Sequence, residues 1–115
     1  MPTIDQFMAA SDVPVVMADQ RGVITFVNDL FLDTFLWERE DLIGQALLVL
    51  IPETLRDAHQ MGFSRFYVSG EGTILNQQLA LEIVTGDGRT VSAEHFIIAE
   101  ERAGEWVMGA SVRPL

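Results

Sequence analysis

Two histidines are the side chains in this sequence most able to do chemistry. His59 lies at the centre of IPETLRDAHQMGFSRF (51–66), and a helix that begins near Pro52 would place it on an apolar face. The residues expected on the same face of that helix, within an arc of about 100°, are Leu55, Gly62, Phe63 and Phe66. An imidazole in such a place can pack in the core, bind a metal ion or transfer protons.

The second histidine, His95, lies in TVSAEHFII (90–98), which has the two-residue period of a β-strand. The alternation puts Val91, Ala93 and Ile97 on the same face as His95, and Phe96 and Ile98 on the opposite face. Within the sequence EWVMG, Trp106 and Met108 are expected to join Phe96 and Ile98. The apolar set Phe96, Ile98 and Trp106 is then a candidate dimer interface.

Composition excludes several kinds of protein. The chain has 115 residues, of which 49% are hydrophobic, so we expect one domain spanning 1–115. Its 17 acidic and 7 basic residues give a net charge of -10, which disfavours nucleic acids and anionic membranes. No apolar run approaches the roughly 20 residues that cross a bilayer, and the N-terminus lacks a basic leader, so we expect a cytoplasmic protein without membrane insertion.

Catalytic motifs are absent from the sequence. It contains no G-x-S-x-G, P-loop, G-x-G-x-x-G or H-E-x-x-H, and it contains no cysteine for thiol catalysis or zinc-thiolate binding. The acidic pairs Glu38/Asp41 and Glu100/Glu101 are flanked by loop residues and are expected to be solvated. We therefore expect a protein that is not an enzyme.

The expected elements define an α+β fold with an antiparallel sheet. A hairpin comes first and is followed by three short helical segments, in which apolar residues recur with a period of about 3.6 residues. Three strands come last, and in them the period is two residues. Asn28 is the N-cap of the first of these helical segments, and TGDGR (85–89) is the strongest turn signal. The expected strands are 14–19, 23–28, 76–84, 90–98 and 105–112. Core residues are expected to include Phe31, Phe35, Phe63, Phe66, Leu81 and Ile97.

The N-terminal segment 1–12 is expected to be a cap on the domain. Within TIDQFMAA (3–10), Ile4, Phe7 and Met8 have helical spacing, so this helix would cover the apolar sheet face of its own chain or of a partner. The sequence leaves both arrangements open.

The order of these elements resembles the PAS domain family. The matching fragments are G-V-I-T-F-V-N, D-L-I-G-Q, I-P-E, R-x-x-H, G-E-G, D-G-R and G-A-S-V-R, in the family's order over nearly the whole chain. The resemblance implies a five-stranded antiparallel sheet with short helices packed on one face, a core at 13–113, and a pocket on the side of His95. It also implies a sensory or regulatory domain that binds a small ligand, forms homodimers, or acts on an effector or kinase domain elsewhere.

One fragment is similar to a narrower group. P-E-x-x-R-x-x-H followed by S-R-F resembles the helix of haem-binding PAS oxygen sensors, which implies His59 as the iron ligand and Arg65 as a propionate partner. The arginine that contacts oxygen in those sensors is here Leu79, and Thr73 replaces another propionate partner. His95 or Gln77 would then fill the sixth position of the iron. Without cysteine, flavin adducts and thioester-linked chromophores are excluded, while non-covalent flavin is not.

The sequence thus gives three alternatives: a sensor of a small molecule, a haem-based gas or redox sensor, and a cofactor-free dimerisation module. We expect no cofactor, with haem b as the leading candidate if one binds and His59 as its metal ligand. The candidate binding residues are His59, Phe63, Arg65, Phe66, Gln77, Leu79, His95 and Ile97.

Overall fold

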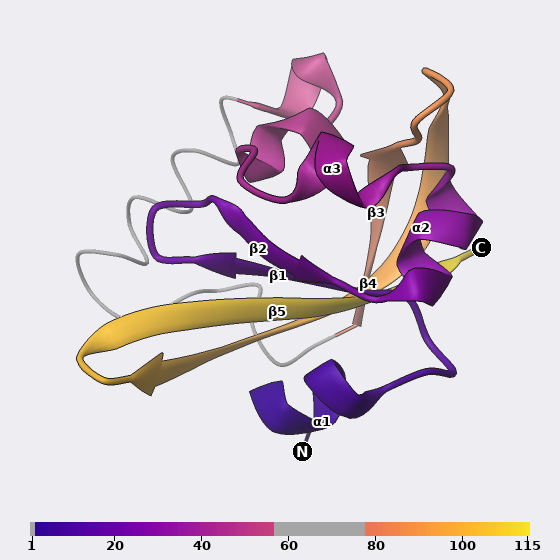
Figure 1. Cartoon of the computed structure of the whole chain (residues 1–115). Helices are drawn as coiled ribbons and strands as arrows, with labels where there is room; N and C mark the ends of the chain where they lie inside the picture. Colours follow the sequence, from indigo (N-terminus) through magenta and orange to yellow (C-terminus); the bar gives the residue numbers. More distant parts are fainter. Residues whose placement is uncertain (1, 57–77) are drawn as a thin grey trace.

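A computed structural model describes residues 2–56 and 78–115 of the chain (Figure 1). Its helices are α1 Ile4–Ala9, α2 Asp29–Phe35 and α3 Arg39–Leu42, with 3-10 turns η1 Leu47–Leu50 and η2 Glu53–Leu55. Its strands are β1 Val15–Asp19, β2 Ile24–Val27, β3 Gln78–Val84, β4 Thr90–Arg102 and β5 Glu105–Pro114. The helix predicted to carry His59 lies outside the described residues beyond Arg56.

The five strands form one antiparallel sheet in the order β2-β1-β5-β4-β3. This order brings the first hairpin of the chain beside its last strand. The helices α2 and α3 lie on one side of the sheet and α1 lies on the other (Figure 1). The predicted α+β class and five-stranded antiparallel sheet are therefore confirmed. We call the side covered by α2 and α3 the inner face and the side covered by α1 the outer face.

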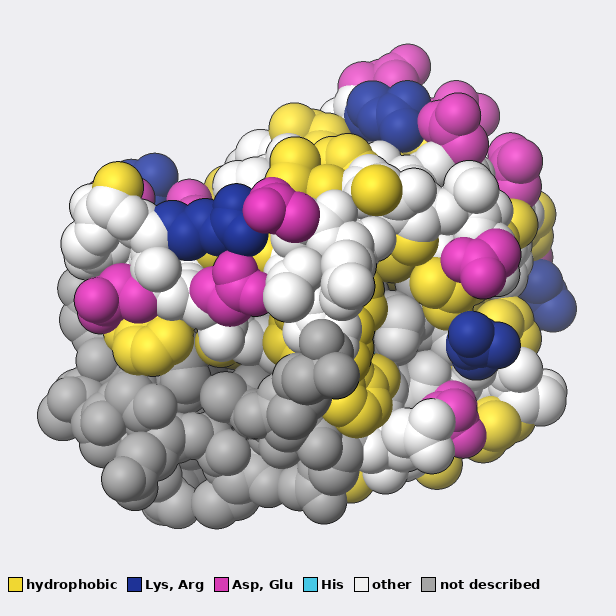
Figure 2. All heavy atoms as spheres, turned by 90° about the horizontal axis from the view of Figure 1, so that it is seen from below, with side chains coloured by type: hydrophobic (Ala, Val, Ile, Leu, Met, Phe, Trp, Pro, Cys, Tyr) yellow, Lys and Arg dark blue, Asp and Glu magenta, His cyan; other side chains and the backbone are white. Residues whose placement is uncertain are grey.

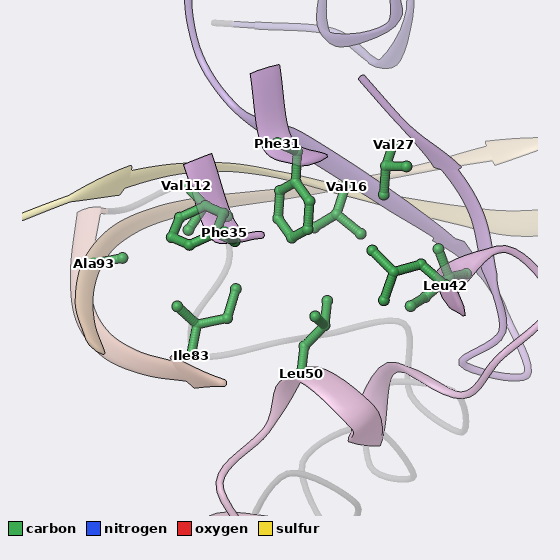
Figure 3. Packing of buried hydrophobic residues seen from close by; sticks show 10 residues of the cluster. Val16, Val27, Phe31, Phe35, Leu42, Leu50, Ile83, Ala93 and Val112 are labelled. Carbon is green, nitrogen blue, oxygen red and sulfur yellow. The ribbon is translucent and has the colours of Figure 1, made fainter. Parts of the chain in front are cut away.

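The main core lies between α2, α3, η1 and the inner face (Figure 3). Phe31 and Phe35 are 0% and 1% exposed, and their ring centroids lie 4.9 Å apart, as a tilted aromatic pair. They pack with the other members of this cluster, which are Val16, Ile24, Val27, Leu42, Leu50, Ile83, Ala93 and Val112. The prediction that Phe31 and Phe35 are core residues is confirmed.

Other core predictions fared differently. Leu81 is 37% exposed, so its prediction as a core residue was wrong. It lies on the inner face opposite Ala93, but β3 is an edge strand, and Ile83 is the β3 residue that joins the core cluster. Ile97 is half-buried. Phe63 and Phe66 lie outside the described residues.

A second apolar cluster joins α1 to the outer face. Ile4 and Phe7 of α1 are buried against Ile98 and Met17, whereas Met8 is 48% exposed. Gly109 of β5 permits this contact, because a Cβ there would lie 3.1 Å from both the Cδ1 methyl of Ile4 and the ring carbon Cδ2 of Phe7. The sequence left open whether this helix covers the sheet of its own chain or of a partner, and the structure shows that it covers the sheet of its own chain.

Charged groups at the start of α1 reinforce this contact. The backbone N–H of Ile4 donates to the Glu100 carboxylate at 2.9 Å, and Arg102 pairs with both Glu100 and Asp5. The Ile4 N–H and the Arg102 guanidinium hold the pKa of the Glu100 carboxyl below its ordinary value. Because these ion pairs are exposed, the buried Ile4 and Phe7 side chains contribute most of the attachment.

The register of the long β4-β5 hairpin corrects one expectation. Ile98 lies opposite Gly109, and Glu101 lies opposite Trp106, so Trp106 and Met108 face the inner side of the sheet. The prediction that they share a surface with Phe96 and Ile98 was wrong. Ala103 and Gly104, both with positive φ, form the two-residue turn that sets this register. A shift of the pairing by one residue would move every side chain of β5 to the opposite face of the sheet.

The predicted TGDGR turn is confirmed, but its two glycines serve different purposes. Gly88 has φ +86 and supplies the left-handed residue of the turn. Gly86 is needed because it lies against the end of α2, where its N–H donates to the Phe35 carbonyl at 2.9 Å. A Cβ on Gly86 would lie 1.8 Å from the Leu36 carbonyl oxygen, so no larger residue fits without displacing backbone.

Candidate functional site

Three of the predicted binding residues meet on the inner face of β3 and β4. The register places Leu79 directly opposite His95, and His95 opposite Val112 of β5. Ile97 is two residues further along the same face, opposite Ala110. Leu79, His95 and Ile97 are all half-buried. The sheet therefore brings one imidazole into a row of aliphatic side chains.

The tautomer of His95 follows from its hydrogen bond. Its Nδ1 lies 3.1 Å from the carbonyl oxygen of Ala93, two residues earlier on the same strand. A carbonyl oxygen only accepts, so Nδ1 carries the proton and donates. In the neutral ring Nε2 then holds a lone pair, which can accept a hydrogen bond or coordinate a metal ion.

Burial determines the charge of this imidazole. Desolvation lowers the pKa of His95 from its ordinary value of 6.5, although the hydrogen bond to Ala93 acts in the opposite direction. The ring is therefore neutral at physiological pH. Its neighbours Leu79 and Val112 supply no side-chain donor, so this row of the sheet offers one acceptor in an apolar setting.

This shift predicts a dependence of stability on pH. Because the folded-state pKa of His95 is depressed, the unfolded chain binds the extra proton first, and the contribution of His95 to the free energy of unfolding is lost as pH falls below about 6.5. Chemical denaturation from pH 8 to pH 5 should show a smaller loss for His95→Gln than for the wild type. Equal pH slopes in the two proteins would contradict a neutral, buried His95.

Five predicted site residues, which are His59, Phe63, Arg65, Phe66 and Gln77, lie outside the described residues. Two roles therefore stay predictions: His59 as an iron ligand and Arg65 as a partner of a propionate. In the ranges 2–56 and 78–115, no group of three or more histidine, cysteine, aspartate or glutamate side chains could hold a metal ion. A metal centre built from protein ligands alone has no support in this part of the chain.

Sequence reasoning missed two residues of the inner face. Trp106 and Met108 lie on the same side of the sheet as His95, and both are half-buried. The signal that could have placed them is the Ala103-Gly104 pair, which suits a two-residue hairpin turn and fixes which residues of β5 oppose β4. Their position adds an aromatic ring and a thioether to the inner face of β5.

The fold and the arrangement of its inner face define the PAS class of domain. The family described as PAS fold matches residues 4–97, which is most of the chain. The chain therefore belongs to the PAS family, and this membership supports a role in sensory signalling. A comparison with curated proteins finds no significant match.

Solved structures show the same fold at low sequence identity. A PAS domain from Desulfitobacterium hafniense is 13% identical with a TM-score of 0.73, covering 95% of this chain and 98% of that one. A PAS domain from a two-component sensor histidine kinase is 15% identical with a TM-score of 0.72, covering 94% and 89%. A PAS domain of an HTR-like protein from Haloarcula marismortui is 20% identical with a TM-score of 0.69, covering 91% and 83%.

Within the described ranges, the helices are all too short or too polar to cross a membrane.

Proposed function

We propose that this PAS domain is a sensory module that binds a small ligand against the inner face of its sheet. The observation that carries this proposal is His95, a neutral imidazole whose Nδ1 is held by the Ala93 carbonyl and whose Nε2 bears a lone pair among aliphatic side chains. A polar group fixed in this way is typical of a ligand site, where few polar atoms orient a mostly apolar ligand.

The ligand that fits this face is apolar in most of its surface and donates one hydrogen bond to His95. A carboxylate or phosphate would find no cation in the row formed by Leu79, His95 and Val112. The half-buried Ile97 and Met108 extend the apolar surface on either side of the β4-β5 pairing. An uncharged ligand is therefore favoured over an anionic one.

Haem b is the second candidate, and His95 is the described residue that favours it. The lone pair on Nε2 suits an iron ligand, and Leu79 and Ile97 suit the apolar porphyrin. His59 would be a second residue that holds the iron and Arg65 would pair with a propionate, as the resemblance to the oxygen sensors implies. When bound, haem would supply an iron that takes up a gas or changes oxidation state, while His95 and His59 would hold it in place.

Absorption spectroscopy distinguishes these candidates. We expect the protein to purify without a Soret band and to take up added hemin more weakly than the oxygen sensors it resembles. His59→Ala should abolish such uptake, and His95→Ala should change the spin state of the bound iron, because it would remove a nitrogen that holds the iron. A stoichiometric Soret band in the protein as isolated, lost in His59→Ala, would instead establish the haem sensor.

The proposal includes output through a partner. We infer that the domain is a cytoplasmic homodimer without catalytic activity, whose signal passes to an effector or kinase domain. The PAS domain of the sensor histidine kinase, which shares this fold, supports that arrangement. Ile98 is 3% exposed and lies beneath Ile4 and Phe7 of its own chain, so the outer face at Ile98 is not the contact surface. Sedimentation over a range of concentrations tests the dimer, and a monomer throughout would contradict it.

A further inference from the structure

A groove of about 470 Å³ lies on the outer face, away from His95. It is lined by Pro2, Gln78, Glu94, Phe96, Ser111 and Arg113. Phe96 pairs with Gln78 on one side and with Ser111 on the other, so these three residues form one row across β3, β4 and β5. Figure 2 views the molecule from this α1 side, where hydrophobic and charged side chains are interspersed. The groove volume lies within the range of small-molecule sites.

The neighbouring row of the groove carries two opposite charges. Glu94 and Arg113 are direct cross-strand partners on the outer face of β4 and β5. Side chains so placed normally have Cβ atoms only about 5 Å apart. Even so, among the interactions of residues 2–56 and 78–115 there is no ion pair between them, although Arg102 and Glu100 on the same face do pair. Both charges of the groove are thus available to a ligand.

We propose that this groove binds a small zwitterion, namely an α-amino acid with an apolar or aromatic side chain. The guanidinium of Arg113 and the hydroxyl of the adjacent Ser111 are donors for the carboxylate. The Glu94 carboxylate accepts from the ammonium group. The half-buried ring of Phe96 provides the apolar surface on which the ligand side chain packs.

Charge complementarity selects this class of ligand over simple ions. An anion that pairs with Arg113 is repelled by Glu94 and by the net charge of -10, and a cation that pairs with Glu94 is repelled by Arg113. A molecule with both charges a few bond lengths apart satisfies both residues. Pro2, which leads into α1, forms part of the wall, so an occupied groove also contacts the segment that precedes the outer-face helix.

Calorimetric titration with L-phenylalanine tests the site. We expect saturable binding, weakened about tenfold or more in Arg113→Gln and in Glu94→Gln, since each removes one charge-assisted contact. Arg89→Gln is the matched control, because Arg89 carries the same charge in the β3-β4 turn, where it pairs with Asp87, and this variant should bind as the wild type does. N-acetyl-phenylalanine and phenylalaninamide, which each lack one charge, should bind more weakly than phenylalanine.

Two outcomes would overturn the proposal. One is the lack of saturable heat with L-phenylalanine up to about 10 mM, a concentration that detects even millimolar sites. The other is binding that Arg113→Gln and Glu94→Gln leave unchanged. His95→Ala separates this site from the inner face, because it should leave phenylalanine binding intact. Loss of phenylalanine binding in a folded His95→Ala protein would assign the ligand to the inner face instead.

Discussion

Phe31→Ala should lower the free energy of unfolding by about 3–5 kcal/mol, the largest single effect we expect in this domain. Phe31 is 0% exposed and lies at the centre of the inner-face cluster, 4.9 Å from the ring of Phe35. Truncation removes the buried ring and its aromatic contact and leaves a cavity, because the backbone of α2 and the sheet cannot close around an alanine.

Chemical denaturation of Phe31→Ala beside Met8→Ala gives the measurement and its control. Met8 is also a large apolar residue on a helix, but it is 48% exposed, so its truncation should change the free energy of unfolding by no more than about 0.5 kcal/mol. A loss below about 1 kcal/mol in Phe31→Ala would show that the inner-face core is not packed as described.

Asn28→Ala should cost about 3 kcal/mol, although asparagine is polar, because its side chain joins three segments of the chain. Its Oδ1 accepts from the backbone N–H of Val15 and of Phe31, both at 3.0 Å. Its Nδ2 donates to the carbonyl oxygens of Val13 at 2.8 Å and Ala10 at 3.2 Å. Asn28 is 8% exposed, so alanine would leave these backbone groups without their partner and largely shielded from water.

Asn28→Ser is the matched variant that separates the two roles. A serine hydroxyl can still cap α2 by accepting from the Phe31 N–H, but it is too short to reach the carbonyls of Ala10 and Val13. We expect a loss of roughly 1–2 kcal/mol, between the wild type and Asn28→Ala. Equal losses in Asn28→Ser and Asn28→Ala, measured by urea denaturation, would show that the cap contributes nothing beyond the other contacts.

Local patterns in the sequence determined the fold class and the aromatic pair at the core, Phe31 and Phe35. Alternation over 90–98 placed Ala93 and His95 on one face, and the helical spacing after Asn28 placed Phe31 and Phe35 in the core. Such patterns are reliable because side-chain direction follows directly from the period of the backbone. The ordered fragments shared with the PAS family then fixed the sheet, since a family motif carries the topology that periodicity alone leaves open.

The tertiary structure decided what depends on pairing between distant segments. The register of the β4-β5 hairpin sent Trp106 and Met108 to the inner face, and the edge position of β3 left Leu81 exposed. Contacts between residues far apart in the chain also place α1 over the outer face. Strand pairing of the same kind places Glu94 beside Arg113. A period of two fixes which residues share a face of one strand, but only the pairing of strands fixes which residues meet across it.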